Sequence, residues 1–66
     1  MGRWKVDEHF NYIQAIKDNQ TLEEVIYALR QTVPMRTACQ VKAHHQKMIN
    51  KYGGWQQIRD GYPNHN

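Results

Sequence analysis

Three stretches of the chain repeat apolar residues at the spacing of an amphipathic helix, about 100° per residue. The first stretch runs from about Lys5 to Asp18, and acidic residues at its start suit the positive end of a helix dipole. Its apolar face is predicted to hold Val6, His9, Tyr12, Ile13 and Ile16. Its polar face is predicted to hold Asp7, Asn11, Gln14 and Asp18.

A capping box marks the start of the second helix, where the Thr21 hydroxyl and the Glu24 carboxylate can bind free backbone amides. We expect this helix to end near Arg30 or Gln31, because Pro34 disfavours helical geometry at the residue before it. Its apolar stripe is narrow and consists of Leu22, Val25, Ile26 and Leu29.

The third helix is predicted to begin after a Thr37 cap, to continue to about Tyr52 and to stop at Gly53-Gly54. Its apolar face holds Val41, His45, Met48, Ile49 and Tyr52. The opposite face holds Cys39, Ala43, Gln46 and Asn50, with Lys42 and Lys47 on its flanks. The small residues permit close approach to a surface, and the amides can donate and accept hydrogen bonds.

These helices form one predicted domain over residues 3–53, followed by a tail over residues 54–66. A chain of 66 residues buries only roughly 60% of its unfolded surface, so its stability should be small. The apolar residues of the tail are Trp55, Ile58 and Tyr62. The spacing of the first two predicts a helical turn that docks on the core through Trp55, with a frayed terminus as the alternative.

Positive and negative charges are segregated along the chain, although the net charge is only +3. Residues 1–24 contain three basic and five acidic side chains, whereas residues 25–66 contain six basic side chains and one acidic one. This asymmetry is typical of a protein half that binds a polyanion, although an ordinary solvated surface also tolerates it. Composition therefore favours a nucleic-acid partner without requiring one.

The inventory of reactive groups argues against an enzyme. The chain has no serine, no glycine-rich phosphate loop, and no length to shield a pair of carboxylates from water. Its apolar runs are too short to span a membrane or to form a signal peptide. We therefore expect an intracellular protein without catalysis, cofactor, membrane partner or small-molecule substrate.

A metal site is not expected either. Cys39 is the only cysteine, which excludes an internal disulfide and multi-cysteine zinc frameworks. Neither His44 nor His45 has a His or Cys partner four residues away. We expect His45 and His9 to be hydrogen-bonded core residues, with His44 at the edge of the apolar stripe. Cys39 is either a redox-sensitive thiol or simply a small residue that faces a groove.

A longer pattern of residues joins the three predicted helices. It comprises Trp4, Asp7-Glu8, Tyr12, Ala15-Ile16, Leu22, Val25-Ile26, Leu29 and the run R-T-x-x-Q-V-x-x-H-x-Q-K at residues 36–47. This pattern, which covers residues 4–52, resembles a Myb/SANT repeat. The last run is similar to the single-repeat subgroup whose third helix reads R-T-x-x-Q-V-x-S-H-A-Q-K-Y. Lys5, Leu22 and His45 depart from the family pattern, so core packing should differ.

The resemblance implies an all-α, three-helix bundle of the helix-turn-helix, homeodomain-like type. It further implies a nuclear protein of transcription regulation or chromatin that binds double-stranded DNA, with the third helix in the major groove. Lys42, Gln46 and Lys47 match family positions that face DNA. Ala43 stands where the subgroup has serine, so one potential base contact is missing.

Eight residues are therefore expected to contact DNA. Lys42 is expected to donate to guanine, and Gln46 or Asn50 to bond an adenine edge. Basic residues beside them are assigned to phosphates, which should make binding strongly dependent on salt. The full set is Arg36, Cys39, Lys42, Ala43, Gln46, Lys47, Asn50 and Lys51.

The alternative is a SANT-type module that binds histone tails or another subunit of a chromatin complex. Phe10 and Tyr27 lie outside the main apolar stripes of their helices, and exposed aromatics are enriched where partners dock. The acidic residues that could receive a basic tail are Asp7, Glu8, Asp18, Glu23 and Glu24.

Overall fold

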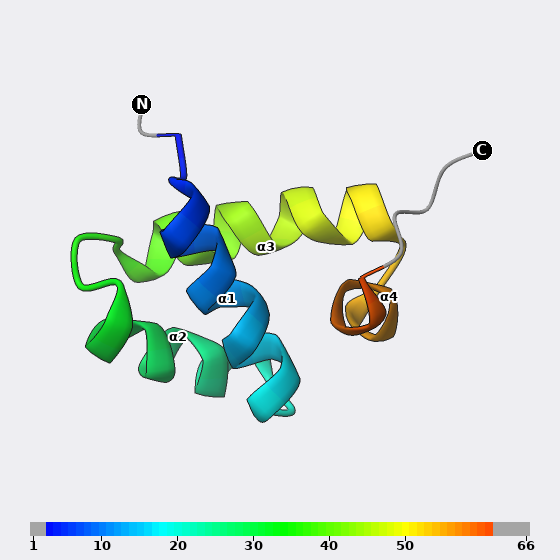
Figure 1. Ribbon diagram of the computed structural model, residues 1–66, viewed down its shortest axis with the longest axis horizontal. Helices are drawn as coiled ribbons and strands as arrows, with labels where there is room; N and C mark the ends of the chain where they lie inside the picture. Colours follow the sequence, from blue (N-terminus) through cyan, green and yellow to red (C-terminus); the bar gives the residue numbers. More distant parts are fainter. Residues whose placement is uncertain (1–2, 62–66) are drawn as a thin grey trace.

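The computed structural model describes residues 3–61, and all of the regular secondary structure in this range is helical (Figure 1). The helices are α1 (Val6–Asp18), α2 (Leu22–Thr32), α3 (Ala38–Tyr52) and α4 (Trp55–Asp60). The predicted all-α class is thus confirmed. Tyr62, which we counted among the apolar residues of the tail, lies outside the described residues.

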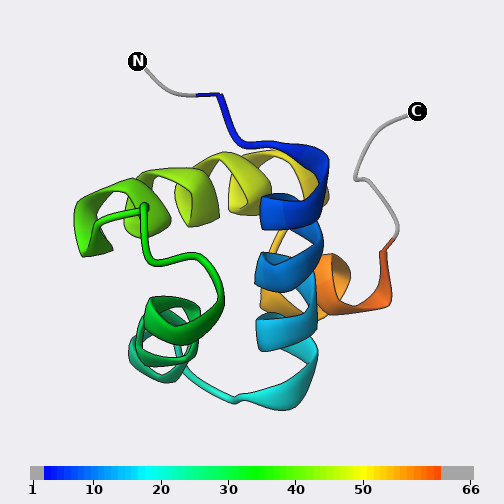
Figure 2. The ribbon, with the colours of Figure 1, turned by 60° about the vertical axis from the view of Figure 1, so that its left-hand side comes forward.

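The longest helix, α3, lies at one edge of the molecule, and α1, α2 and α4 all lie on the same side of it (Figures 1 and 2). α2 lies under the first half of α3, and α4 lies under its end. α1 runs between α2 and α4 and packs against both. The fold therefore leaves one side of α3 without a covering helix.

Side-chain caps fix the start of α2 and of α3. The Thr21 hydroxyl accepts a hydrogen bond from the Glu24 backbone N–H at 3.2 Å, and the Glu24 carboxylate accepts one from the Thr21 N–H at 3.1 Å. Thr37 and Gln40 make the same reciprocal pair at the start of α3, at 3.2 and 2.8 Å. Both predicted caps, Thr21 and Thr37, are confirmed, because their side chains satisfy amides that the helix leaves free.

Local backbone chemistry also ends these helices. α2 continues to Thr32, slightly beyond the predicted end, and Val33 leaves the helix with φ −133° directly before Pro34. α3 ends at Gly53, whose φ of 108° lies in the left-handed region that glycine adopts without a steric penalty.

All four helices and the α2–α3 loop contribute to one core. Its largest fully buried side chains are Tyr12, Ile16, Val25, Leu29, Val33, Val41 and Ile58. α3 supplies only Val41 to this set, so the remaining residues of its inner face are half-buried. Because few residues carry the core of so small a domain, each one matters for stability.

The predicted inner face of the first helix was wrong at one end. Val6 is 89% exposed, and Glu8 is buried instead. Glu8, Tyr12 and Ile16 follow one another at a spacing of four, so they share a face of α1. Val6 precedes Glu8 by two positions, about 200° around the helix, and therefore points to solvent.

Glu8 is turned inward because it binds Arg36. A carboxylate oxygen of Glu8 accepts from Arg36 Nη2 at 2.8 Å and from the Lys5 backbone N–H at 3.0 Å. These hydrogen bonds, with Lys5 as the larger cause, hold the pKa of the Glu8 carboxyl below its usual range. Arg36 Nη2 also donates to the backbone carbonyl of Arg3 at 2.8 Å, so one guanidinium joins the N-terminal segment, α1 and the loop before α3.

A layer of rings fills the space between α1 and α3. No Cα atom of α1 lies within 8 Å of a Cα atom of α3. The five rings between these helices, which we call the ring layer, belong to Trp4, His9, Tyr12, His44 and His45.

Stacking and hydrogen bonds order this layer. The rings of Trp4 and His44 stack with centroids 4.1 Å apart, and Tyr12 meets His44 edge-on at 5.0 Å. A hydrogen bond of 2.9 Å joins His9 Nδ1 and His44 Nε2, and one of 2.8 Å joins the Tyr12 hydroxyl and His45 Nδ1. The expectation that His9 and His45 are hydrogen-bonded is confirmed. His44, expected at the edge of the stripe, lies in the middle of the layer.

Burial makes the charged forms of these rings unfavourable. It lowers the pKa of His9 and His45, and burial followed by the charge of His9 and of Lys47 lowers the pKa of His44 to about 4. Burial also raises the pKa of Tyr12, so its hydroxyl keeps its proton. The ring layer is therefore uncharged at neutral pH.

The first part of the tail belongs to the core. The pair expected to form a docked turn, Trp55 and Ile58, lies on α4. Ile58 is completely buried, whereas Trp55 is half-buried and its ring meets His45 edge-on at 5.6 Å. α4 contacts both α1 and α3, so it closes the end of the core that α2 does not reach.

Ile58→Ala tests whether α4 is an integral part of the fold. Truncating a fully buried isoleucine should cost about 2–5 kcal/mol of unfolding free energy, because it removes apolar contacts and leaves a cavity. The measurement is urea or thermal unfolding followed by circular dichroism. Val6→Ala, at a position 89% exposed, is the control and should change stability by less than about 0.5 kcal/mol. Equal stabilities of the two variants would contradict the assignment.

Acid should destabilise the protein through the ring layer. The pKa values of His9, His44 and His45 lie below the ordinary 6.5, so the unfolded chain binds more protons than the folded one in this range. Their contribution is complete above pH 6.5 and is lost as the pH falls toward 4. We expect the melting temperature to fall between pH 7.5 and pH 5.

His44→Phe is the matched variant for this experiment, because it keeps a ring in the stack and removes a strongly shifted imidazole. Its melting temperature should fall less than that of the parent over the same pH range. The Glu8 carboxyl acts only below its ordinary pKa of 4.5 and does not interfere. An equal fall in parent and variant would refute this account of the layer.

Candidate nucleic-acid interface

The outer side of α3 presents a row of exposed side chains. α3 is continuous over 15 residues. Its inner side carries the buried Val41 and faces the ring layer. The exposed row therefore lies on the face that the apolar periodicity predicted. It consists of Cys39, Ala43, Gln46 and Asn50, one turn of helix apart.

The two amides of this row bind each other. Gln46 Nε2 donates to Asn50 Oδ1 at 3.1 Å. This contact leaves the Gln46 carbonyl oxygen as an acceptor and the Asn50 amide nitrogen as a donor. The pair therefore offers both hydrogen-bonding functions side by side at the C-terminal end of the row.

The N-terminal end of the row is shallow. Cys39 and Ala43 have short side chains, and both are exposed. The Cys39 thiol is free. A planar or grooved partner can thus approach the backbone of α3 more closely here than at the amide pair.

Lys42 marks one flank of the row. It lies at the rim of a hollow of about 260 Å³ between α2 and α3. Arg30 of α2 shares this hollow, together with Tyr27 and the acid Glu23. One cation from each of the two helices and one acid therefore line this hollow beside the row, an arrangement that the sequence alone did not predict.

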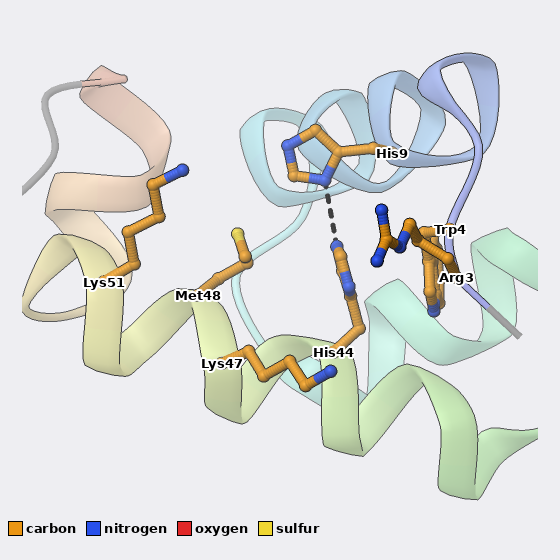
Figure 3. Close-up of a pocket in the computed structure, with 7 residues that line it drawn as sticks. All are labelled: Arg3, Trp4, His9, His44, Lys47, Met48 and Lys51. Atoms are coloured by element: carbon orange, nitrogen blue, oxygen red, sulfur yellow. Dashed lines mark hydrogen bonds between the residues drawn. The ribbon is translucent and has the colours of Figure 1, made fainter. Parts of the chain in front are cut away.

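Lys47 and Lys51 mark the other flank. They are four residues apart and lie on one side of α3. They line a second hollow of about 210 Å³ between α3, α1 and the segment before α1, which we call the N-terminal pocket (Figure 3). Its lining consists of Arg3, Trp4, His9, His44, Lys47, Met48 and Lys51.

Arg36 does not belong to this interface. The prediction that it contacts phosphate is corrected, because its side chain is only 9% exposed and is paired with Glu8. Its guanidinium also lies over the Trp4 ring, 5.1 Å from the centroid. Exposing it to a phosphate would break these contacts and leave the buried Glu8 carboxylate without its cation.

The features that suggested a protein partner remain on α1 and α2. Phe10 and Tyr27 are each 65% exposed. The acidic set loses one member, because Glu8 is buried and paired with Arg36. Asp7, Asp18, Glu23 and Glu24 stay exposed, although the last of these caps α2.

Residues 3–61 contain neither a cluster of metal-ligating side chains nor a helix that could span a membrane. No group of three or more His, Cys, Asp or Glu side chains in this range is arranged to hold a metal ion. None of the helices described is both long and apolar enough to cross a bilayer.

Sequence reasoning missed the residues that other elements bring to α3. Arg3 and Trp4 reach the His44 side of α3 from the N-terminal segment, and Arg30 of α2 lines the same hollow as Lys42. No local pattern predicts these neighbours, because each pair is far apart in sequence. The excess of basic residues after residue 24 was a signal for Arg30, but not for Arg3 or Trp4.

Searches of protein-family models, of curated proteins and of solved structures find no match to this chain.

Proposed function

We propose that the protein binds double-stranded DNA by placing the outer side of α3 in the major groove. The domain would act as a Myb/SANT-like module of the helix-turn-helix type in a nuclear transcriptional or chromatin protein. The observation that carries the proposal is the exposed row of small and amide side chains with cations on both flanks.

This arrangement suits the shape and charge of the groove. The major groove is about 12 Å wide and admits an α-helix, with a phosphate backbone along each edge. A helix inserted there needs short or hydrogen-bonding side chains toward the bases and positive charge on both sides. α3 has the first in Ala43 and Gln46, and the second in Lys42 and Lys47.

The exposed residues divide into base and phosphate contacts. Gln46 or Asn50 can bond an adenine edge bidentately once their mutual hydrogen bond opens, and Lys42 can donate to guanine. Lys47 and Lys51 are assigned to phosphates. Each phosphate that such cations neutralise should add about −0.9 to the slope of log K against log salt.

A protein-interaction module is the second candidate. The exposed Phe10 and Tyr27 favour it, because large aromatics at 65% exposure are common where partners dock. The acidic residues that remain exposed on α1 and α2 would then meet a basic histone tail. The two activities use different surfaces, so one does not exclude the other.

Lys42→Ala and Gln46→Ala test the DNA proposal. Each should lose about 1–3 kcal/mol of discrimination between preferred and mismatched duplexes, because each removes a predicted base contact. The measurement is titration of duplexes selected from a random pool, by fluorescence anisotropy at two salt concentrations. Lys17→Ala, which removes an exposed cation from the far end of α1, is the control and should bind like the parent.

Two outcomes would count against the proposal. Parent protein that fails to bind duplexes, or binds them without a salt dependence, is incompatible with α3 in a groove. Binding of histone-tail peptides that Phe10→Ala and Tyr27→Ala abolish would then support the second candidate. A selection that yields no motif while binding stays salt-dependent would indicate sequence-independent DNA binding.

A further inference from the structure

The N-terminal pocket concentrates positive charge. Arg3, Lys47 and Lys51 contribute three cations to its lining, and among residues 3–61 no aspartate or glutamate lines it. Glu8, in the first turn of α1, is bound to Arg36 and is absent from the lining. An anion is therefore the ligand that this pocket favours by charge.

The imidazoles in the pocket add a neutral hydrogen-bond donor. His9 Nδ1 and His44 Nε2 share one hydrogen bond, so one ring donates and the other accepts (Figure 3). The ring that accepts carries its N–H on its second nitrogen, His9 Nε2 or His44 Nδ1, which we call the outer N–H. The pair therefore always keeps one N–H available beyond their shared bond.

The pocket suits a small anionic group better than a whole nucleotide. Its volume of about 210 Å³ is below the 300–1,000 Å³ typical of small-molecule sites. The Trp4 ring is already stacked on His44 and lies under the Arg36 guanidinium. The Trp4 ring is thus already in contact with other side chains, so a ligand in the pocket would be bound mainly by the cations of its lining.

The position of the pocket connects it with the outer side of α3. Lys47 follows Gln46 and Lys51 follows Asn50, so the two lysines lie about 100° around the helix from the amide pair. The other wall is formed by Arg3 and His9, which come from outside α3. A strand that borders a groove filled by α3 would pass over this opening.

We propose that the N-terminal pocket binds a single phosphodiester group of the DNA backbone, an inference that rests on the DNA binding proposed above. Arg3, Lys47 and Lys51 surround the phosphate, and the outer N–H of the His9–His44 pair donates to one of its oxygens. The N-terminal segment and α1 then act as part of the interface and not only as support for α3.

The double variant Arg3→Gln, Lys51→Gln tests this assignment in duplex binding. It should bind every duplex about tenfold more weakly, because a charge-assisted contact is lost without a base contact. The salt slope should fall by no more than about 1, the value of one phosphate, because Lys47 remains beside the same group. The control, Lys17→Gln with Arg59→Gln, removes the same charge from exposed positions on α1 and α4 and should leave the slope unchanged.

Unchanged affinity of the Arg3→Gln, Lys51→Gln double variant, which we call the pocket variant, would overturn the inference, while Lys42→Ala and Gln46→Ala still test DNA binding separately. A fall of about 2 would also overturn it, because the two cations would then contact different phosphates. Circular dichroism of both double variants verifies that they fold, which is expected because all four positions are exposed.

A second measurement decides the matter if the parent binds no duplex. Thymidine dinucleotide, which has a single phosphodiester, is titrated while the Trp4 indole and His44 resonances are followed by NMR. Shifts that are absent with the uncharged methylphosphonate analogue, and absent in the pocket variant, would support a phosphodiester site even if the DNA proposal had failed. The absence of shifts in the parent would then overturn the inference.

Discussion

α3 is attached to the rest of the protein through side-chain rings, and the exposure of its outer side depends on that attachment. The backbones of α1 and α3 do not approach within 8 Å between Cα atoms, and Val41 is the only fully buried residue of α3. The ring layer fills the interval with stacked and edge-on contacts. Its two hydrogen bonds fix the rotation of α3, because His44 and His45 must each meet a partner on α1. That rotation turns Gln46 outward.

A layer built from imidazoles in place of aliphatic side chains has an electrostatic consequence. His44 and His45 belong to α3, and His9 of α1 is hydrogen-bonded to His44, but burial keeps all three neutral at physiological pH. The positive charge beside the outer side of α3 therefore comes from the lysine and arginine side chains that line the two hollows. The same rings supply donors and acceptors that carry no charge. Packing and polar recognition are thus combined in one set of residues.

The sequence was sufficient for features that depend on neighbours along the chain. Helix bounds followed from the Thr21 and Thr37 caps, from Pro34 and from Gly53, and the two sides of α3 followed from its periodicity. It was insufficient where a distant partner decides the outcome. Glu8 looked like a solvated first-turn acid, and Arg36 like a free cation, until the fold placed them 2.8 Å apart. The buried side of α1 therefore includes Glu8 and not Val6, which differs from the predicted side. Hydrophobicity alone could not predict this difference, because it places a carboxylate inside the protein.

Arg36 has a structural role at the start of α3. A guanidinium that binds Glu8 and the Arg3 carbonyl fixes the entry to α3, just as α4 and Trp55 fix its exit. It cannot also reach a phosphate, because a buried carboxylate without its cation is costly. The fixed Arg3 carbonyl, however, places the Arg3 side chain at the wall of the N-terminal pocket. Arg36 therefore adds no charge to the exposed surface beside α3. Arg3, whose carbonyl it binds, contributes a positive charge to the N-terminal pocket instead.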